Sequence, residues 1–441
     1  MIEIIPNIIF LLILIFSIGF FIRNIKKIIK IIKLGKPIDR SDNPNKRLYN
    51  LLRVALGQSK MISRPISGIL HILVYLGFIV INIELLEIII DGIFGTHRYF
   101  SKIFNPFFYD LLIATFEIFA LLVIISVIIF WCRRNILNIK RFLNKEMKGW
   151  PKLDADNILY FEIILMLLFL SMNTTDLILQ ENLYDGYNKA GFFPISSLLI
   201  PIFANLELST VYFLERTFWW LHITGIFLFL NYLYYSKHLH ILLAFPNTYY
   251  FNLDNKGKFK VLESVKREVM MMIYPDKINE NENQLTDKFG ASDALDLNWV
   301  QIMNAYSCTE CGRCTSECPA NQTGKLLSPR KIMMDVRDRL EKISINIFKN
   351  KGEFVNDNDQ LLDNYISREE LWACTSCNAC TETCPIDIDP LSIIMDMRQY
   401  LIMEESSAPP DLYNMMNNIE NNGAPWPYNQ QDRELWTQQI N

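Results

Sequence analysis

Residues 308–319 read CTECGRCTSECP, and residues 374–385 read CTSCNACTETCP. Both segments have the spacing C-x2-C-x2-C-x3-C-P, which holds a [4Fe–4S] cluster in bacterial ferredoxins. The first three cysteines of such a run wrap one face of a cluster, and the fourth ordinarily binds the other cluster. The chain is therefore expected to bind two [4Fe–4S] clusters.

Crossed binding divides eight cysteines into two sets of four. One cluster is predicted to bind Cys308, Cys311, Cys314 and Cys384, and the other Cys374, Cys377, Cys380 and Cys318. The alternatives are a pair of zinc knuckles or a disulfide framework. A four-cysteine zinc site usually separates two CxxC pairs by a long loop and has no use for the third cysteine. Disulfides require an oxidising compartment, which nothing else in the chain indicates.

Composition predicts a membrane part followed by a soluble part. The 441 residues are 51% hydrophobic with a net charge of -4, and the apolar residues are concentrated in the first half. The ninth cysteine, Cys132, ends an apolar run and is expected to pack rather than react. The soluble half has no basic stripe interleaved with aromatic residues, which argues against nucleic acid as a partner.

Five apolar segments are long enough to cross a bilayer, namely residues 4–22, 66–90, 111–131, 158–178 and 211–235. Basic residues follow the first segment and fill the loop between the third and fourth. The positive-inside rule therefore predicts an outside N-terminus and a cytoplasmic iron–sulfur part at a bacterial inner membrane. The first segment lacks the features of a cleaved signal peptide and is expected to remain as a span. Residues 24–34 predict an amphipathic helix on the inner surface.

The expected fold is all-α, in three parts. Residues 1–245 form a five-span membrane domain that resembles cytochrome b bundles, residues 246–290 a polar linker, and residues 291–441 a helical ferredoxin domain. Helices are predicted at residues 291–306 and, after the two cysteine motifs, at residues 328–340 and 390–401. A cysteine loop followed by a helix thus occurs twice.

The five histidines suggest a haem site inside the membrane part. Imidazole is the usual axial ligand of a b-type haem, and a membrane histidine is by default a functional residue. His222 and His240 are eighteen residues apart, about five turns, so both project from one face if the helix is continuous, whereas His238 points away. His71 and His240 are expected at similar depth and to bind one haem. The alternative is that His71, His238 and His240 have packing or interfacial roles.

A second haem nearer the outer side would use His222, with His97 as the candidate partner. Three carboxylates, Glu84, Glu87 and Glu117, lie in the outer halves of their spans, where an unpaired charge is costly. They are expected to carry protons for a quinone. The alternative is pairing with Arg98 or interfacial placement.

The membrane half resembles the cytochrome b subunit of respiratory nitrate reductase and of heterodisulfide reductase. This resemblance implies five spans, an outside N-terminus and haem-binding histidines on the second and fifth spans. The separation of His222 and His240 matches that family's fifth span. In nitrate reductase, a second histidine lies ten residues after the position of His71, and this chain has Ile81 there.

Residues 296–426 resemble the helical ferredoxin part of heterodisulfide reductase. The resemblance rests on NWVQ at residues 298–301, CTECGRC at residues 308–314 and NGAPWP at residues 422–427. Larger relatives continue into two cysteine-rich CCG modules, and no CCG occurs in these 441 residues.

Together these features predict an electron-transfer subunit between a cytoplasmic redox partner, two clusters, haem b and the quinone pool. It would act as an oxidoreductase only within a complex, because the soluble half has no nucleotide-binding loop, flavin motif or paired catalytic carboxylates. The expected partner is a CCG-module protein, an electron-transfer flavoprotein or an acyl-CoA dehydrogenase. The alternatives are a haem-free membrane anchor for a ferredoxin domain and a component of a redox-driven ion pump.

Overall fold

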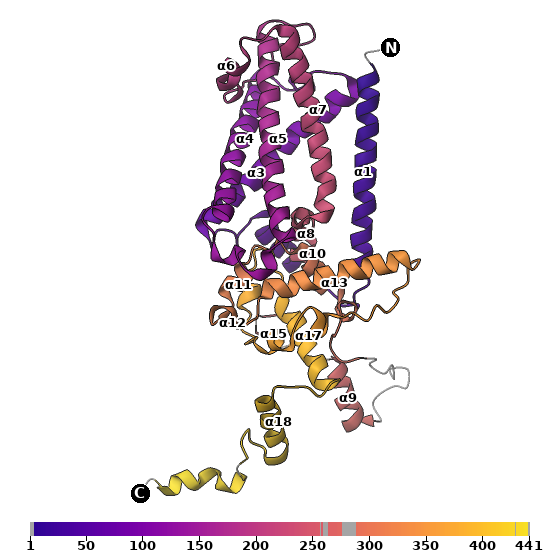
Figure 1. The fold of residues 1–441 in the computed structure, drawn as a ribbon, viewed down its shortest axis with the longest axis vertical. Helices are drawn as coiled ribbons and strands as arrows, with labels where there is room; N and C mark the ends of the chain where they lie inside the picture. The colour runs from indigo at the N-terminus through magenta and orange to yellow at the C-terminus, as the bar shows by residue number, and fades with distance from the viewer. Residues whose placement is uncertain (1–3, 256, 259–262, 276–287, 428, 440–441) are drawn as a thin grey trace.

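The chain folds into a bundle of long helices with a layer of short helices beneath it (Figure 1). The computed structural model describes residues 4–255, 257–258, 263–275, 288–427 and 429–439. Within these residues there are helices, loops and two isolated bridges, but no strands. The prediction of an all-α protein is confirmed.

Four helices are long and apolar enough to cross a membrane: α1 (Ile5–Ile32), α3 (Pro65–Phe94), α4 (Pro106–Asn135) and α5 (Trp150–Glu181). They match the first four predicted spans. The fifth prediction falls on α7 (Leu208–Tyr232), which packs along α5. Polar residues such as Glu215 and Arg216 lower the hydropathy of α7, so it is not among the four. Large apolar side chains cover the outside of the bundle, as expected of a membrane protein.

The first helix runs without a break to Ile32. The predicted amphipathic segment at residues 24–34 therefore continues α1 and does not form a separate surface helix. Its buried residues Ile28 and Ile31 belong to the same hydrophobic core as the short helices beneath the bundle. This shared core joins the two parts of the chain.

The helix that carries His222 ends before His240. After α7 come η7 (Leu233–Tyr235), an extended Ser236, η8 (Lys237–Leu239) and α8 (His240–Tyr249). The Ser236 hydroxyl accepts a hydrogen bond from the His238 amide, and Asp154 of α5 accepts one from the Lys237 amide at 3.0 Å. These side chains satisfy amides that a continuous helix would bond internally. The prediction of one face shared by His222 and His240 on an unbroken helix is therefore wrong.

Three helices organise the iron–sulfur part: α10 (Trp299–Ser307), α13 (Pro329–Lys349) and α17 (Pro390–Met403). The helix predicted at residues 291–306 begins only at Trp299, because the Asn298 side chain caps it by accepting from the Val300 and Gln301 amides. Ser328 and Asp389 cap the other two helices, which confirms the helices predicted after each cysteine motif. The predicted linker contains the end of α8 and all of α9 (Glu263–Ile273). Its run NENEN lies outside the described residues.

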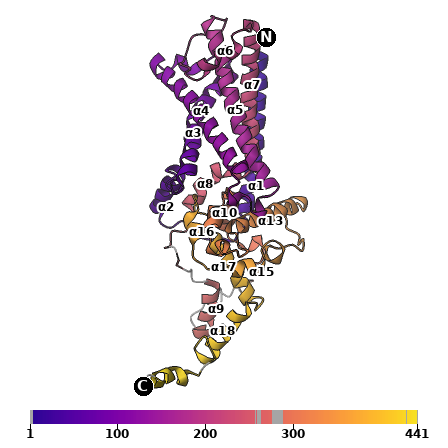
Figure 2. The ribbon, with the colours of Figure 1, turned by 60° about the vertical axis from the view of Figure 1, so that its left-hand side comes forward.

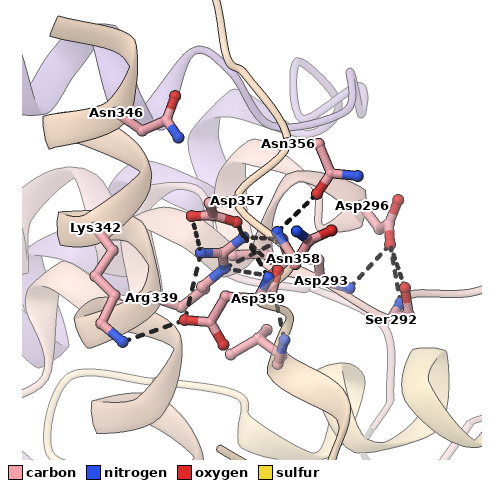
Figure 3. Close-up of polar contacts among 12 residues, drawn as sticks. Ser292, Asp293, Asp296, Arg339, Lys342, Asn346, Asn356, Asp357, Asn358 and Asp359 are labelled. Atoms are coloured by element: carbon pink, nitrogen blue, oxygen red, sulfur yellow. Dashed lines mark hydrogen bonds and ion pairs between the residues drawn. The ribbon is translucent and has the colours of Figure 1, made fainter. Parts of the chain in front are cut away.

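A buried arginine ties a loop to α13 (Figure 3). Arg339 is 1% exposed and donates hydrogen bonds to Asp293 and Asp357 at 2.8 and 2.7 Å. It also donates to the backbone carbonyl of Asp359 at 2.6 Å. Because a buried charge requires partners, this network fixes residues 357–359 and the start of the iron–sulfur part against one helix.

The iron–sulfur part is bonded directly to the end of α1. The Lys36 amide donates to the Leu297 carbonyl at 2.9 Å, and the Trp299 amide donates to the Lys36 carbonyl at 3.2 Å. Gly35 lies so close to the Trp299 backbone that a Cβ atom would have no room. Figures 1 and 2 show α10 and α13 directly beneath the long helices, while α18 (Pro410–Asn422) and η12 (Gln430–Gln439) extend away from both parts.

Candidate functional site

The two cysteine motifs adopt the same backbone conformation. Glu310 and Ser376, which occupy equivalent positions, have φ of 54° and 57°. Gly312 and Asn378 have φ of 71° and 60°, and glycine and asparagine tolerate this left-handed region best. Each motif then enters a short helix, α11 (Arg313–Glu317) or α16 (Ala379–Thr383). The sequence duplication is therefore also a duplication of structure.

A cavity is lined by cysteines from both motifs: Cys308, Cys311, Cys314, Cys380 and Cys384. Its walls include the apolar side chains of Met333 and Ile388. Burial raises the pKa of Cys308 to about 11 and also raises the pKa of Cys314 and Cys384. Buried thiols of this kind need a positive charge to ionise, and the iron of a cluster would supply it. The sulfur donors and apolar walls fit a [4Fe–4S] cluster.

The remaining cysteines gather at the second motif. Cys374 lies within electrostatic range of Cys377 and of Cys318, the last cysteine of the first motif. Burial raises the pKa of Cys374, and burial followed by the nearby Asp389 raises that of Cys380 to about 12. Within the described residues, no three Cys, His, Asp or Glu side chains are grouped so that they could hold a metal ion as they stand. The two ligand sets therefore stay predictions, made from spacing and neighbourhood.

Charged side chains link the first motif to the membrane part. Glu310 pairs with Lys237, just beyond α7, and accepts from Arg337 at 2.5 Å. Arg313 donates to the carbonyls of Lys60 and Met61, at 3.0 and 3.3 Å, in the segment that leads into α3. A further pair joins Arg64 to Glu317 at 2.7 Å. This loop thus lies against the inner end of the bundle.

Three histidines meet at that inner end. His71 of α3 has a buried Nδ1 without a hydrogen-bond partner, and it lies within electrostatic range of His240 and Arg313. The His238 and His240 rings are 5.3 Å apart. His240 Nδ1 lies 3.1 Å from the Lys237 carbonyl oxygen, so a proton on Nδ1 leaves Nε2 to bind a metal. Burial lowers the pKa of His240, which keeps the ring neutral for that purpose.

The other two histidines lie elsewhere and have different partners. His222 is buried in α7, with Nδ1 3.0 Å from the Leu165 carbonyl oxygen. His97 places Nε2 2.8 Å from an Asp176 oxygen, and its ring stacks near Tyr187 with centroids 4.6 Å apart. His97 is thus bound to Asp176 rather than placed as a second ligand opposite His222.

Arg98 holds together a buried polar network at the outer end. It donates to Glu84, Asp176 and Asn173, at 3.2, 2.8 and 2.7 Å. Glu117 accepts from the Ile195 and Ser196 amides, and Glu87 accepts from the Tyr109 hydroxyl and the Phe100 amide. The pairing expected as the alternative for Glu84 is what the structure contains.

Asp176 and Asn173 were missed by the sequence analysis. Their signal was the polar run NTTD at residues 173–176, inside an otherwise apolar span. Cys132, at the end of α4, is partly buried and unpaired with another cysteine.

Comparison with known proteins places the cysteine motifs in a defined domain family. Residues 307–388 match the 4Fe-4S dicluster domain. The chain is 26% identical to the "Probable iron-sulfur-binding oxidoreductase FadF" of Bacillus subtilis, over 97% of this chain and 60% of that protein. It is 24% identical to the "EtfAB:quinone oxidoreductase" of Syntrophomonas wolfei, over 90% of this chain and 55% of that protein.

A third relative matches the iron–sulfur part alone. It is one polypeptide of the ferredoxin/F(420)H(2)-dependent CoB-CoM heterodisulfide reductase of Methanosarcina acetivorans, 29% identical over 27% of this chain and 60% of its own length. The chain thus spans somewhat more than half of the relatives it matches. No solved structure matches it significantly. The resemblance to heterodisulfide reductase-like iron–sulfur proteins is confirmed, and the class is that of membrane iron–sulfur proteins for electron transfer.

Proposed function

We propose that the chain is a membrane-bound subunit that passes electrons between a soluble redox partner, two [4Fe–4S] clusters, one haem b and the quinone pool. The observation that carries this proposal is the cysteine-lined cavity, whose loop is bonded to the inner end of the membrane helices beside His71 and His240. When bound, the iron centres supply one-electron chemistry. The protein holds them in sequence and excludes water from them.

The cluster ligands follow the crossed arrangement. Cys308, Cys311, Cys314 and Cys384 hold one cluster, and Cys374, Cys377, Cys380 and Cys318 hold the other. The shared cavity supports the first set, and the proximity of Cys318 to Cys374 supports the second. His71 and His240 hold the haem. The buried, unpartnered nitrogen of His71 and the hydrogen bond that orients His240 support this pair.

The outer end of the bundle is the side proposed for quinone chemistry. The network around Arg98 places several carboxylates in a buried setting, where the uncompensated ones hold protons. We also propose α7 as the fifth span, with the N-terminus outside and the iron–sulfur part in the cytoplasm of a bacterial cell. The basic residues that follow α1 and α4 support this orientation.

The proposed partner is an electron-transfer flavoprotein. One relative bears the name EtfAB:quinone oxidoreductase, which supports both this donor and quinone as the acceptor. The heterodisulfide reductase relative favours a CCG-module protein instead, and that is the second candidate.

Spectroscopy of the purified full chain tests the proposal. We expect two reducible [4Fe–4S] signals by electron paramagnetic resonance (EPR) and a b-type pyridine haemochrome spectrum. Clusters without any b-type spectrum would favour the haem-free anchor. The absence of both centres would overturn the electron-transfer function.

A further inference from the structure

Resting on the proposed function, we infer a fixed order for the two cluster sites. The inner site is defined by Cys308, Cys311, Cys314 and Cys384, and it exchanges electrons with the membrane part. The outer site is defined by Cys374, Cys377, Cys380 and Cys318, and it exchanges electrons with the soluble partner. Each electron that one site loses the other gains, and no bond forms or breaks.

The contacts of the first motif point to the membrane. Arg313, between Cys311 and Cys314, donates to the Lys60 and Met61 carbonyls and lies within electrostatic range of His71. Arg330, which lines the same cavity, donates to the Arg141 carbonyl at 2.8 Å in the loop after α4. Two separate membrane loops thus cover the inner site.

The end of the second motif, which carries Cys384, also touches the membrane part. Lys60 donates to the Glu382 carbonyl at 3.1 Å and pairs with Asp387 at 2.5 Å. Asn247 donates to the Ile386 carbonyl at 2.6 Å. The one cysteine that crosses from the second motif to the first cavity is therefore held on the membrane side.

The start of the second motif has the opposite surroundings. Ser376 contacts Met395, and Arg398 donates to the carbonyls of Leu371 and Cys374, all within the iron–sulfur part. Cys377 is exposed, whereas Cys308 and Cys384 are buried. A surface pocket opens beside Cys374, lined in part by Trp372, Ala373 and Pro409. This face is open to a soluble protein, and the inner face is closed to one.

The order is tested by relaxation of the EPR signals with dysprosium–EDTA, a soluble paramagnetic complex that acts on centres near the surface. The full chain is purified in detergent, and the two signals are assigned with Cys377→Ser and Cys311→Ser, which change the second cysteine of each motif. We expect the signal that survives in Cys311→Ser to relax several-fold more in response than the one that survives in Cys377→Ser. The reverse order, or an equal response, would overturn the inference while leaving the proposed function intact.

A second variant secures the assignment if a serine variant loses both clusters. Arg398→Gln keeps every cysteine and removes a cation beside Cys374, so it should lower the reduction potential of the outer cluster alone. The dysprosium-sensitive signal must then be the one whose potential changes. A full chain without any cluster signal would overturn both the proposed function and this inference.

Discussion

Cys384 belongs to the second motif in sequence but lines the cavity of the first in the structure. We therefore expect Cys384→Ser to alter the same cluster signal as Cys308→Ser, because both thiols are proposed to bind one cluster. EPR of the two reduced variants provides the measurement. Cys374→Ser is the matched control and should alter the other signal. A Cys384→Ser spectrum that matched Cys374→Ser would contradict crossed binding.

The histidines give a second prediction at this scale. His71→Ala and His240→Ala should each remove the haem, since a b-type haem held by one axial ligand is readily lost. His97→Ala should retain it, because His97 is bound to Asp176 in the outer network. Pyridine haemochrome content per polypeptide is the measurement. Retention in His240→Ala together with loss in His238→Ala would show that His238 is the ligand instead.

Residue spacing was informative where the chemistry is local. Four cysteines within eleven residues must share a loop, so the cluster motifs and their internal symmetry could be predicted. The pairing of His71 with His240 was predicted from a continuous helix that does not exist. The two rings still approach each other, because the chain after Ser236 turns back towards α3 and α5. Spacing cannot predict such a break, since Asp154 of another helix stabilises it.

Among the elements, α13 depends on one buried cation. Arg339→Gln would leave Asp293 and Asp357 close together without a counter-charge, which should cost about 3 kcal/mol of unfolding free energy. Thermal unfolding of the purified protein at pH 7 measures the loss. Lys342→Gln is the control, because Lys342 is 60% exposed and its pair with Asp359 should contribute at most about 1 kcal/mol.

The same variant should also change the dependence of stability on pH. Hydrogen bonds from Arg339 lower the pKa of Asp357 below its ordinary value. A depressed carboxyl pKa stabilises the fold above the unfolded value of about 3.9, and this contribution is lost as the pH falls through the folded value. The gap in Tm between wild type and Arg339→Gln should therefore narrow below about pH 4. A gap that widened on acidification would contradict this assignment.

The type of each element was more predictable than its ends. Apolar length predicted the four long helices, and a capping residue with proline predicted α13 and α17. The start of α10 was placed too early, because the capping box formed by Asn298 and Gln301 was not recognised. The Arg98 network was only partly foreseen, since its members come from α3, α5 and the loop between α3 and α4.

At the scale of the whole molecule, the C-terminal segment offers itself to a partner. Trp426 is 58% exposed and α18 has no buried residue, so Trp426 does not plug the core. Removing residues 423–441 should leave both clusters and the haem in place. Electron delivery between the soluble partner and quinone should fall at least about tenfold, the effect of losing about 1.4 kcal/mol of binding.

Quinone reduction by the purified partner, with EPR and haem content as controls, makes this measurement. A truncated chain that lost a cluster would show that the segment is structural. A truncated chain that kept its full rate would move the docking surface to residues 374–385.

The backbone bonds between Lys36 and residues 297 and 299, with the core shared by α1 and α10, hold the iron–sulfur part still beneath the bundle. Such a part cannot travel between donor and acceptor as a hinged carrier domain would. Every exchange with the soluble partner is then a separate collision, so the turnover rate should increase in proportion to partner concentration until release of the partner becomes limiting. Stiffening or lengthening the segment between α9 and α10 should leave that rate unchanged.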